Sequence, residues 1–419
     1  MARGWDGVAL APLKEVPAGA ANFRPMILDS HVHLKHGDAD PCRSIVPPQW
    51  SDCMTSRQRL LTALRCGQPD RVPVTIFINP HDPTDACTAD PSYAPVLDAM
   101  NRYADVSWSW HVPLGFLLTG TPIEVGQRGL PDGSTEYTVA TPAGPLTSVH
   151  RAGARGELKR WIAEPADIDK WLSLPYVPPA MDWSAVEQAQ AEHGEAITTQ
   201  AVMLDPACCT GFIAEEEVAV WTVRERGLLR SYYDECFRRI MDQVREVCRS
   251  PVDVIYFNGP EYCIPPLMSP RDFEEFVSHY DRQLFTYIRE NGCAADASDK
   301  LILVHSHGKV WQFLEAFRDM GLHGLNVLEP PPMGDVDLAA AKRLIGDEVC
   351  LIGNIQYDEL ARGSLELVES LVREAMAAGK LGGGFILCPC AAPYEHPLPE
   401  RAARNLVRYL ELGHELGEY

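Results

Sequence analysis

Two short runs near the C-terminus contain histidine and cysteine, the residue types that most often hold a zinc ion in proteins. They are His305-Ser306-His307 and Cys388-Pro389-Cys390, and each follows an apolar segment typical of a buried strand. Neutral imidazoles with one thiolate make a donor set of low overall charge, which suits Zn²⁺. The sequence therefore predicts a zinc site assembled from two distant parts of the chain.

The spacing within each run supports this interpretation. Residues two apart on a strand point to the same side, so His305 and His307 can bind one ion together. Pro389 ends its strand and presents Cys388 and Cys390 at the rim, and either cysteine could be the ligand. The alternative is that one histidine packs in the core while the other caps the helix that follows.

A further oxygen ligand could come from Glu329, which stands before the run Pro330-Pro331-Pro332. A carboxylate in this position could bind the metal until substrate displaces it. A purely structural role for Glu329 is the alternative.

Eight strand-like apolar runs alternate with helical patterns and indicate the fold. Strands alternating with helices imply parallel βαβ units, and eight such units close a (βα)8 TIM barrel, an α/β fold. The runs are Val72–Ile78, Asp105–Trp110, Ala196–Leu204, Val252–Phe257, Leu301–Val304, Gly324–Leu328, Val349–Ile352 and Gly384–Leu387.

Two stretches depart from this alternation. Residues 1–53 are irregular and rich in Pro, Gly and Ala, so we expect an N-terminal extension before a barrel that spans residues 54–419. The long connection after the second strand, about residues 111–195, contains alternating segments around the turn Ala143-Gly144-Pro145. This pattern predicts a β-hairpin insertion.

The chemistry of a TIM barrel lies at the C-terminal ends of its strands, so polar residues at those positions are candidates for the active site. The alternative for each is that a polar residue simply begins a loop. We expect catalytic roles for Asn258, Glu261 and Tyr262, which would orient the substrate or move protons. We expect substrate contacts from Asn79, His81, His111, Asp205 and Asn354.

Composition excludes several classes of function. The chain has 37 Lys and Arg against 58 Asp and Glu, and its formal charge of −21 would repel a nucleic acid. No apolar run is long enough to span a bilayer, and there is no signal-peptide pattern at the N-terminus. Thirteen scattered cysteines indicate reduced thiols rather than a disulfide framework. We therefore expect a cytoplasmic protein without a membrane or nucleic acid partner.

The chain resembles the uroporphyrinogen decarboxylase superfamily from Met54 to Glu415. The resemblance rests on the opening run Met54–Leu64 with Asp70-Arg71-Val72-Pro73-Val74, and on three later motifs. These are Met268-Ser269-Pro270, Gly353-Asn354-Ile355 and Gly382-Gly383-Gly384-Phe385-Ile386-Leu387. The family fold is a (βα)8 barrel. Decarboxylases of the heme pathway carry an arginine-rich segment after the first strand, whereas Thr75–Asp90 contains no arginine.

The resemblance is closer to the zinc-dependent corrinoid and thiol methyltransferases. It implies that His305 is a ligand, that His307 stands where the family has cysteine, and that Cys390 or Cys388 matches the final cysteine. It also implies a small substrate such as a methyl ether, a corrinoid (cobalamin) carried by a partner protein or a thiol acceptor, and a monomer or homodimer. A site with fewer thiolates would be less electron-rich and could favour O-demethylation over thiol activation.

Three other interpretations remain open. The chain could be a metal-independent decarboxylase or lyase with Asp205 and Glu261 as acid and base. It could be a non-catalytic barrel that docks to a corrinoid protein. The run His31-Val32-His33 is also similar to the first-strand metal motif of amidohydrolases, although it precedes the barrel, and a packed or lid-forming segment is the simpler interpretation.

Overall fold

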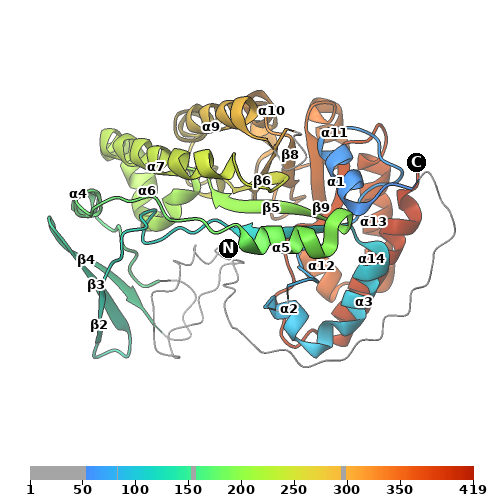
Figure 1. Ribbon diagram of the computed structural model, residues 1–419, viewed down its shortest axis with the longest axis horizontal. Coiled ribbons are helices and arrows are strands. Elements are labelled where there is room, and N and C mark those ends of the chain that lie inside the picture. The colour runs from blue at the N-terminus through green and yellow to red at the C-terminus, as the bar shows by residue number, and fades with distance from the viewer. Residues whose placement is uncertain (1–52, 83, 152–156, 294–298) are drawn as a thin grey trace.

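A computed structural model describes residues 53–82, 84–151, 157–293 and 299–419 (Figure 1). The predicted extension, apart from Cys53, and the run His31-Val32-His33 lie outside the described residues.

One parallel sheet of seven strands curls into a barrel, in the order β1-β5-β6-β7-β8-β9-β10 (Figure 1). Each strand overlaps one of the runs predicted from the sequence, which confirms the α/β barrel fold. The strands are β1 (Val106–His111), β5 (Ile197–Leu204), β6 (Val254–Asn258), β7 (Leu301–Ser306), β8 (Gly324–Val327), β9 (Cys350–Ile355) and β10 (Phe385–Pro389).

The first predicted strand, Val72–Ile78, differs from the prediction because it is extended but makes only isolated bridges. Thr75 N–H donates to Leu387 O at 2.9 Å, and Leu387 N–H donates to Pro73 O at 2.9 Å. On the other side, Asp105 N–H donates to Val74 O at 2.8 Å. Pro73 has no N–H and cannot continue a ladder. The segment therefore closes the barrel between β10 and β1 without forming a regular strand.

Alternate side chains of the strands fill the barrel interior, as the period of two requires. This interior cluster contains Val254 and Tyr256 of β6, Leu301 and Leu303 of β7, and Cys388 of β10. Helix α1 (Ser56–Leu64) inserts Leu60, Leu61 and Leu64 into the same cluster and plugs the N-terminal end of the barrel. Because α1 fills the N-terminal end of the barrel, we expect a site at the other end, where the strands finish.

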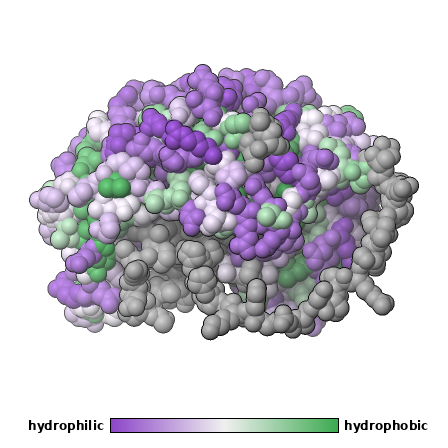
Figure 2. Space-filling view, in the orientation of Figure 1, coloured by the Kyte–Doolittle hydropathy of each residue, from purple (hydrophilic) through white to green (hydrophobic). Residues whose placement is uncertain are grey.

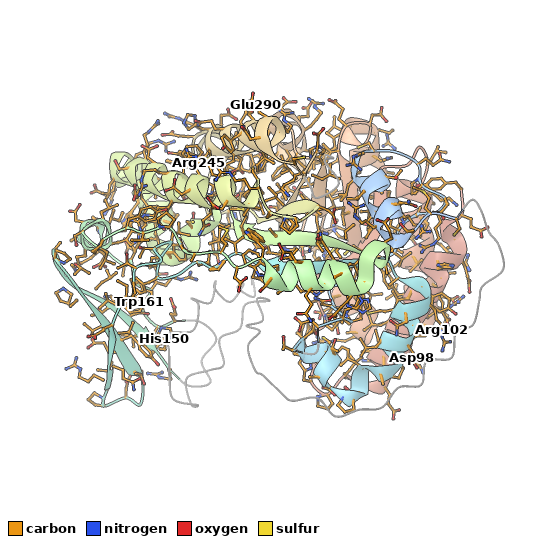
Figure 3. All side chains as sticks on the ribbon, in the orientation of Figure 1. Asp98, Arg102, His150, Trp161, Arg245 and Glu290 are labelled. Atoms are coloured by element: carbon orange, nitrogen blue, oxygen red, sulfur yellow. The ribbon has the colours of Figure 1, made fainter. Side chains whose placement is uncertain are left out.

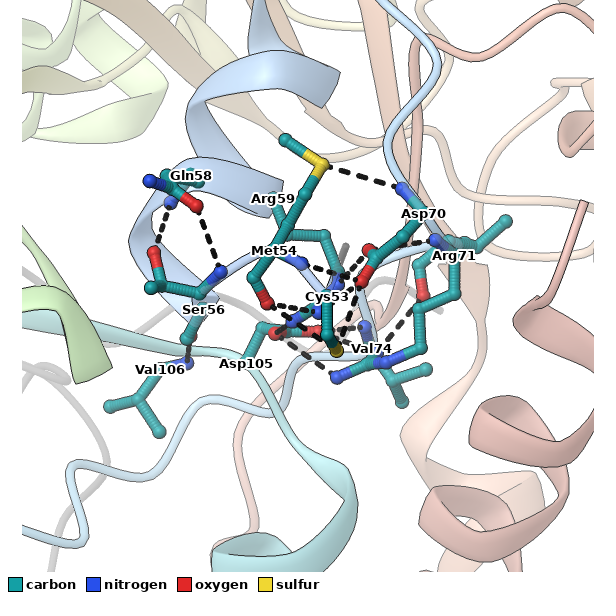
Figure 4. A network of polar contacts seen from close by, with 12 residues as sticks. Cys53, Met54, Ser56, Gln58, Arg59, Asp70, Arg71, Val74, Asp105 and Val106 are labelled. Atoms are coloured by element: carbon teal, nitrogen blue, oxygen red, sulfur yellow. Dashed lines mark hydrogen bonds and ion pairs between the residues drawn. The ribbon is translucent and has the colours of Figure 1, made fainter. Parts of the chain in front are cut away.

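A buried ion network joins α1 to the two elements that meet where the barrel closes (Figure 4). Arg59, which is 4% exposed, donates to Asp105 Oδ1 and to Asp70 Oδ1, both at 2.6 Å. Asp105 also accepts from Arg71 at 2.8 Å and from Val74 N–H at 3.2 Å. Burial acts to raise the pKa of Asp70, but the bonds from Arg59 outweigh it and lower that pKa to about 2.

Replacing Arg59 with leucine should lower the free energy of unfolding by about 3 kcal/mol, because it removes a partner from the buried Asp105 carboxylate. Urea denaturation measures the effect. The matched control is Arg65→Leu at the exposed end of the same helix, which should change stability by less than about 0.5 kcal/mol. Equal effects of the two substitutions would contradict this role for Arg59.

The insertion after β1 forms a three-stranded antiparallel sheet beside the barrel (Figure 1). Strands β3 (Thr135–Thr141) and β4 (Gly144–His150) make the predicted hairpin, with Thr141 opposite Gly144. Strand β2 (Val125–Gly129) adds an edge that the sequence analysis did not predict. His150, the last residue of β4, and Trp161 are labelled in Figure 3, and Trp161 packs edge-on against Phe116 with ring centroids 5.0 Å apart.

Helices cover the outside of the barrel. Helix α8 (Pro270–Phe273) begins with a capping box in which Ser269 accepts from Asp272 N–H, and a π-helical turn at Glu274–Ser278 follows it. The remaining α-helices of the described ranges are α2 (Ala86–Ala89), α3 (Ala94–Tyr103), α4 (Pro165–Leu172), α5 (Ser184–His193), α6 (Glu215–Arg224), α7 (Arg226–Val247), α9 (His279–Asn291), α10 (Leu314–Met320), α11 (Leu338–Ile345), α12 (Tyr357–Arg362), α13 (Leu365–Gly379) and α14 (Glu400–Gly417).

Polar side chains dominate the described part of the face in Figure 2. Within the described ranges, no helix combines the length and apolar character needed to cross a membrane. All cysteines of these ranges are free thiols, as the sequence analysis expected.

Candidate active site

The end of β7 carries the paired histidines. Their ring centroids are 4.7 Å apart with the planes at 75°, so the two side chains lie on the same side of the strand as their spacing predicts. In the parallel register His305 lies opposite Asn258 of β6 and opposite Asn326 of β8. The predicted residues His305 and Asn258 therefore meet at one level of the barrel.

Polar groups of the neighbouring strands hold the His305 ring. Its Nδ1 lies 2.7 Å from the Tyr256 hydroxyl and 2.7 Å from Asn326 Oδ1. Phe77 contacts the ring edge-on, with centroids 5.9 Å apart. Burial, aided by the nearby His307, lowers the pKa of His305 to about 3. His305 is therefore a neutral imidazole at physiological pH, the form that binds metals.

Glu329 binds the segment that carries His307. Its Oε1 lies 3.0 Å from His307 Nδ1, and its Oε2 accepts from Gly308 N–H at 2.7 Å. Burial acts to raise the pKa of Glu329, but the His307 bond and charge and the Gly308 N–H outweigh it and lower that pKa. Glu329 is therefore an anion placed where it orients the imidazole of His307.

The two cysteines after β10 are buried thiols. Burial raises the pKa of Cys388 to about 12, and Cys388 belongs to the interior cluster. Cys390 Sγ lies 3.6 Å from Val327 O. Burial first, and then the charge of Glu329, raise the pKa of Cys390 well above its usual value. Either thiol becomes a thiolate at neutral pH only beside a cation.

These donors fit zinc by type and by orientation. Histidines that bind metals usually donate their second ring nitrogen to an oxygen acceptor, and both Nδ1 atoms here lie beside such oxygens. In the described ranges, however, no three His, Cys, Asp or Glu side chains surround one point closely enough to hold a metal ion. The chain offers suitable donors without a closed shell of three ligands.

The predicted catalytic residues of the β6 loop lie beside this group. The Oε1 atom of Glu261 is buried without a hydrogen-bond partner in the described residues. Burial first, and then the charges of Asp205 and Glu329, raise the pKa of Glu261 well above its usual value. Tyr262 is 9% exposed, and the Arg160 guanidinium lies 6.0 Å from its ring centroid. The raised pKa favours the protonated form of Glu261, the form that can act as an acid.

The predicted substrate-binding residues come from several elements of the barrel. Asn354 lies opposite Cys388 in the parallel register, two residues beyond Ile352, which lies opposite Asn326. His111 ends β1, and burial lowers its pKa to about 4. The side-chain oxygen of Asn79, Oδ1, is buried and accepts no hydrogen bond from the described residues. His81 stacks on His193 of α5, with ring centroids 4.1 Å apart.

Asp205 interacts electrostatically with Asp281 of α9. Both side chains are fully buried, and Asp205 Oδ1 accepts from Cys208 N–H at 2.5 Å, whereas Asp205 Oδ2 and both Asp281 oxygens have no hydrogen-bond partner in the described residues. Two buried carboxylates repel each other, so the pair favours holding a proton. Burial raises the pKa of Asp205 to about 7 and also raises that of Asp281.

Replacing Asp281 with asparagine should stabilise the protein above about pH 7. An acid whose pKa is raised on folding contributes stability at low pH, and that contribution is lost as pH rises from about 4 to about 7. The variant should flatten this decline and gain on the order of 2 kcal/mol at pH 8. Thermal or urea unfolding from pH 5 to pH 8 measures it, with the exposed Asp98→Asn as the matched control. A parallel pH dependence in wild type and Asp281→Asn would contradict the shared proton.

Sequence analysis missed Tyr256, Asn326 and Asp281. Tyr256 stands two residues before Asn258 and Asn326 two residues after Gly324, so strand alternation places both on inward positions. That signal was present in the sequence, but their contact with His305 depends on the register between strands. Nothing in the local pattern around Asp281 indicates its partner.

The fold and this site define an α/β barrel with a polar, partly acidic group at the C-terminal ends of its strands. The family model described as uroporphyrinogen decarboxylase (URO-D) matches residues 186–403. The chain belongs to this family.

A solved methyltransferase structure adds a likeness of fold. A methyltransferase from Methanosarcina mazei is similar over 86% of this chain and 99% of its own, with 16% identity and a TM-score of 0.55. A B12-independent methionine synthase from Shewanella sp. W3-18-1 is similar over 70% of this chain and 74% of its own, with 12% identity and a TM-score of 0.38. None of the curated proteins compared with the chain matches it.

Proposed function

We propose that the chain is a zinc-dependent methyl- or alkyltransferase that moves a methyl group from a small substrate, such as a methyl ether, to a corrinoid protein or a thiol. The observation that carries the proposal is the histidine pair at the end of β7, in which Asn326 and Glu329 engage the two Nδ1 atoms. Family membership and the fold shared with a solved methyltransferase support the class of reaction.

His305, His307 and Cys390 are the proposed ligands, with Cys388 as the alternative thiol. Zinc in this position supplies Lewis acidity, which lowers the pKa of a bound thiol or polarises an ether oxygen. Glu329 orients His307 through its Nδ1 atom, and its role as a displaceable metal ligand stays a prediction. A corrinoid, if it is the acceptor, comes on a partner protein.

The residues of the β6 loop act on the substrate. Glu261 holds a proton on its buried carboxyl and delivers it to the oxygen that leaves when the methyl group is transferred. Asn258 and Tyr262 orient the substrate beside the histidines, since Asn258 lies opposite His305 and Tyr262 follows Glu261 directly. Asn354 and His111 complete the polar lining from β9 and β1.

Purified full-length protein should contain about one zinc per chain, and His307→Ala and Cys390→Ala should each lose most of it. Metal analysis by mass spectrometry gives the content directly. Cys293→Ala, which removes an exposed thiol, is the matched control and should keep the metal. Full zinc content in both ligand variants would overturn the proposed site.

Replacing Glu261 with glutamine should lower kcat by about 10²–10³-fold, because the amide keeps the shape of the side chain without a transferable proton. Zinc content should not change. Methyl transfer from a methyl ether to cobalamin measures the rate, and Glu290→Gln on the outer surface of α9 is the control. Unchanged kcat in Glu261→Gln would remove Glu261 from the reaction.

The raised pKa values of Glu261 and Asp205 also favour a second candidate function. Two carboxyls with raised pKa values could serve as acid and base in a metal-independent decarboxylase or lyase. That activity would survive complete removal of metal by a chelator, whereas methyl transfer through the proposed zinc site would not. A chain that lacks both metal and turnover, yet co-elutes with a corrinoid protein, would instead be a docking partner.

A further inference from the structure

Two oxygen-bearing groups compete for one ring nitrogen of His305. The Tyr256 hydroxyl and Asn326 Oδ1 each lie 2.7 Å from Nδ1, and they lie 3.4 Å from each other. A neutral imidazole has its proton on Nδ1 or on Nε2, and the partners of Nδ1 decide between the two tautomers. A hydroxyl can donate or accept, so Tyr256 alone is compatible with either tautomer.

The orientation of the Asn326 side-chain amide decides between the two tautomers of His305. Its Nδ2 donates to Ile352 O at 3.2 Å, and a backbone carbonyl can only accept. The amide nitrogen must therefore face Ile352, which leaves Oδ1 facing His305. An amide oxygen is also only an acceptor, so an unprotonated Nδ1 at 2.7 Å would place two lone pairs against each other.

We propose that Asn326 is a positioning residue that fixes the proton of His305 on Nδ1 and so places the ring lone pair on Nε2. In this arrangement Nδ1–H donates to Asn326 Oδ1 and to the Tyr256 oxygen, while the Tyr256 hydroxyl donates to Asn326 Oδ1. The whole group is buried, with His305 2% and Asn326 1% exposed, so solvent does not offer substitute partners.

The use of Nε2 as a metal ligand rests on the proposed function, but the tautomer itself does not. A histidine whose Nδ1–H is held by an oxygen acceptor presents Nε2 in a fixed direction, and such partners typically contribute 10–100-fold to metal affinity. Asn326 thus extends the candidate site to β8, which supplies none of the proposed ligands.

Loss of Asn326 should change the tautomer of His305, whereas loss of the Tyr256 hydroxyl should not. In Asn326→Ala the acceptor is gone, so the Tyr256 hydroxyl can donate to Nδ1 and the proton should move to Nε2. In Tyr256→Phe the Asn326 acceptor remains, so Nδ1 should keep its proton. Asn326→Asp restores an acceptor next to Nδ1 and should restore the wild-type tautomer.

Nitrogen NMR of metal-free, full-length protein labelled with ¹⁵N-histidine distinguishes protonated from unprotonated ring nitrogens, and His305→Gln assigns the signals. The expected result is a protonated Nδ1 in wild type and Tyr256→Phe, and a protonated Nε2 in Asn326→Ala. A wild-type ring protonated on Nε2, or an unchanged tautomer in Asn326→Ala, would overturn the inference. The dispersion of the other histidine signals reports whether each variant is folded.

Zinc titration of the same samples gives a second result. Asn326→Ala should bind zinc about 10–100-fold more weakly than wild type, and Tyr256→Phe should bind within a few-fold of it. Equal zinc affinity of wild type and Asn326→Ala would also overturn the positioning role. If wild type binds no zinc, the proposed function fails while the NMR result still decides the tautomer, so the two failures are distinguishable.

Discussion

A buried arginine holds the barrel together at the end opposite to the candidate site. Arg59 binds carboxylates from both sides of the point of closure, next to the short segment that Pro73 keeps from forming a ladder. Few backbone hydrogen bonds join the strands at this point of closure, so ion pairs between side chains contribute to holding the strands together. The inward direction of Phe77, and hence its contact with His305, depends on this closure.

The parallel register brings polar residues of neighbouring strands to the same level of the barrel, where they form the candidate site. Asn258, His305 and Asn326 stand at one level of three consecutive strands, and Cys388 stands opposite Asn354 on the next pair. Burial then shifts each pKa toward the uncharged form of its group: downward for the His305 imidazole, and upward for the Cys390 thiol and the Glu261 carboxyl. Glu329 differs because His307 and Gly308 bind its carboxylate.

The sequence was sufficient for features that depend on local pattern. Apolar runs separated by helical segments located seven strands, and the spacing of His305 and His307 placed both rings on one side of β7. The first run was misjudged as a regular strand because hydrophobicity outweighed the missing N–H of Pro73. Contacts between distant elements, such as Asn326 with His305 or Asp281 with Asp205, depend on register and helix packing, which one sequence does not reveal.

The sparse seam between β10 and β1 gives the barrel a mechanical asymmetry. In a barrel with eight regular strands, every pair of neighbouring strands is joined by a full ladder of backbone hydrogen bonds. In this barrel the segment Val72–Ile78 makes only a few such bonds, and the ion pair between Arg59 and Asp105 reinforces them. Strands β6 to β10, which carry the paired histidines and cysteines, lie in the continuous part of the sheet. Side-chain ion pairs therefore contribute to closing the wall of the barrel at this seam, whereas backbone ladders alone fix the spacing of the strands that carry the paired histidines and cysteines.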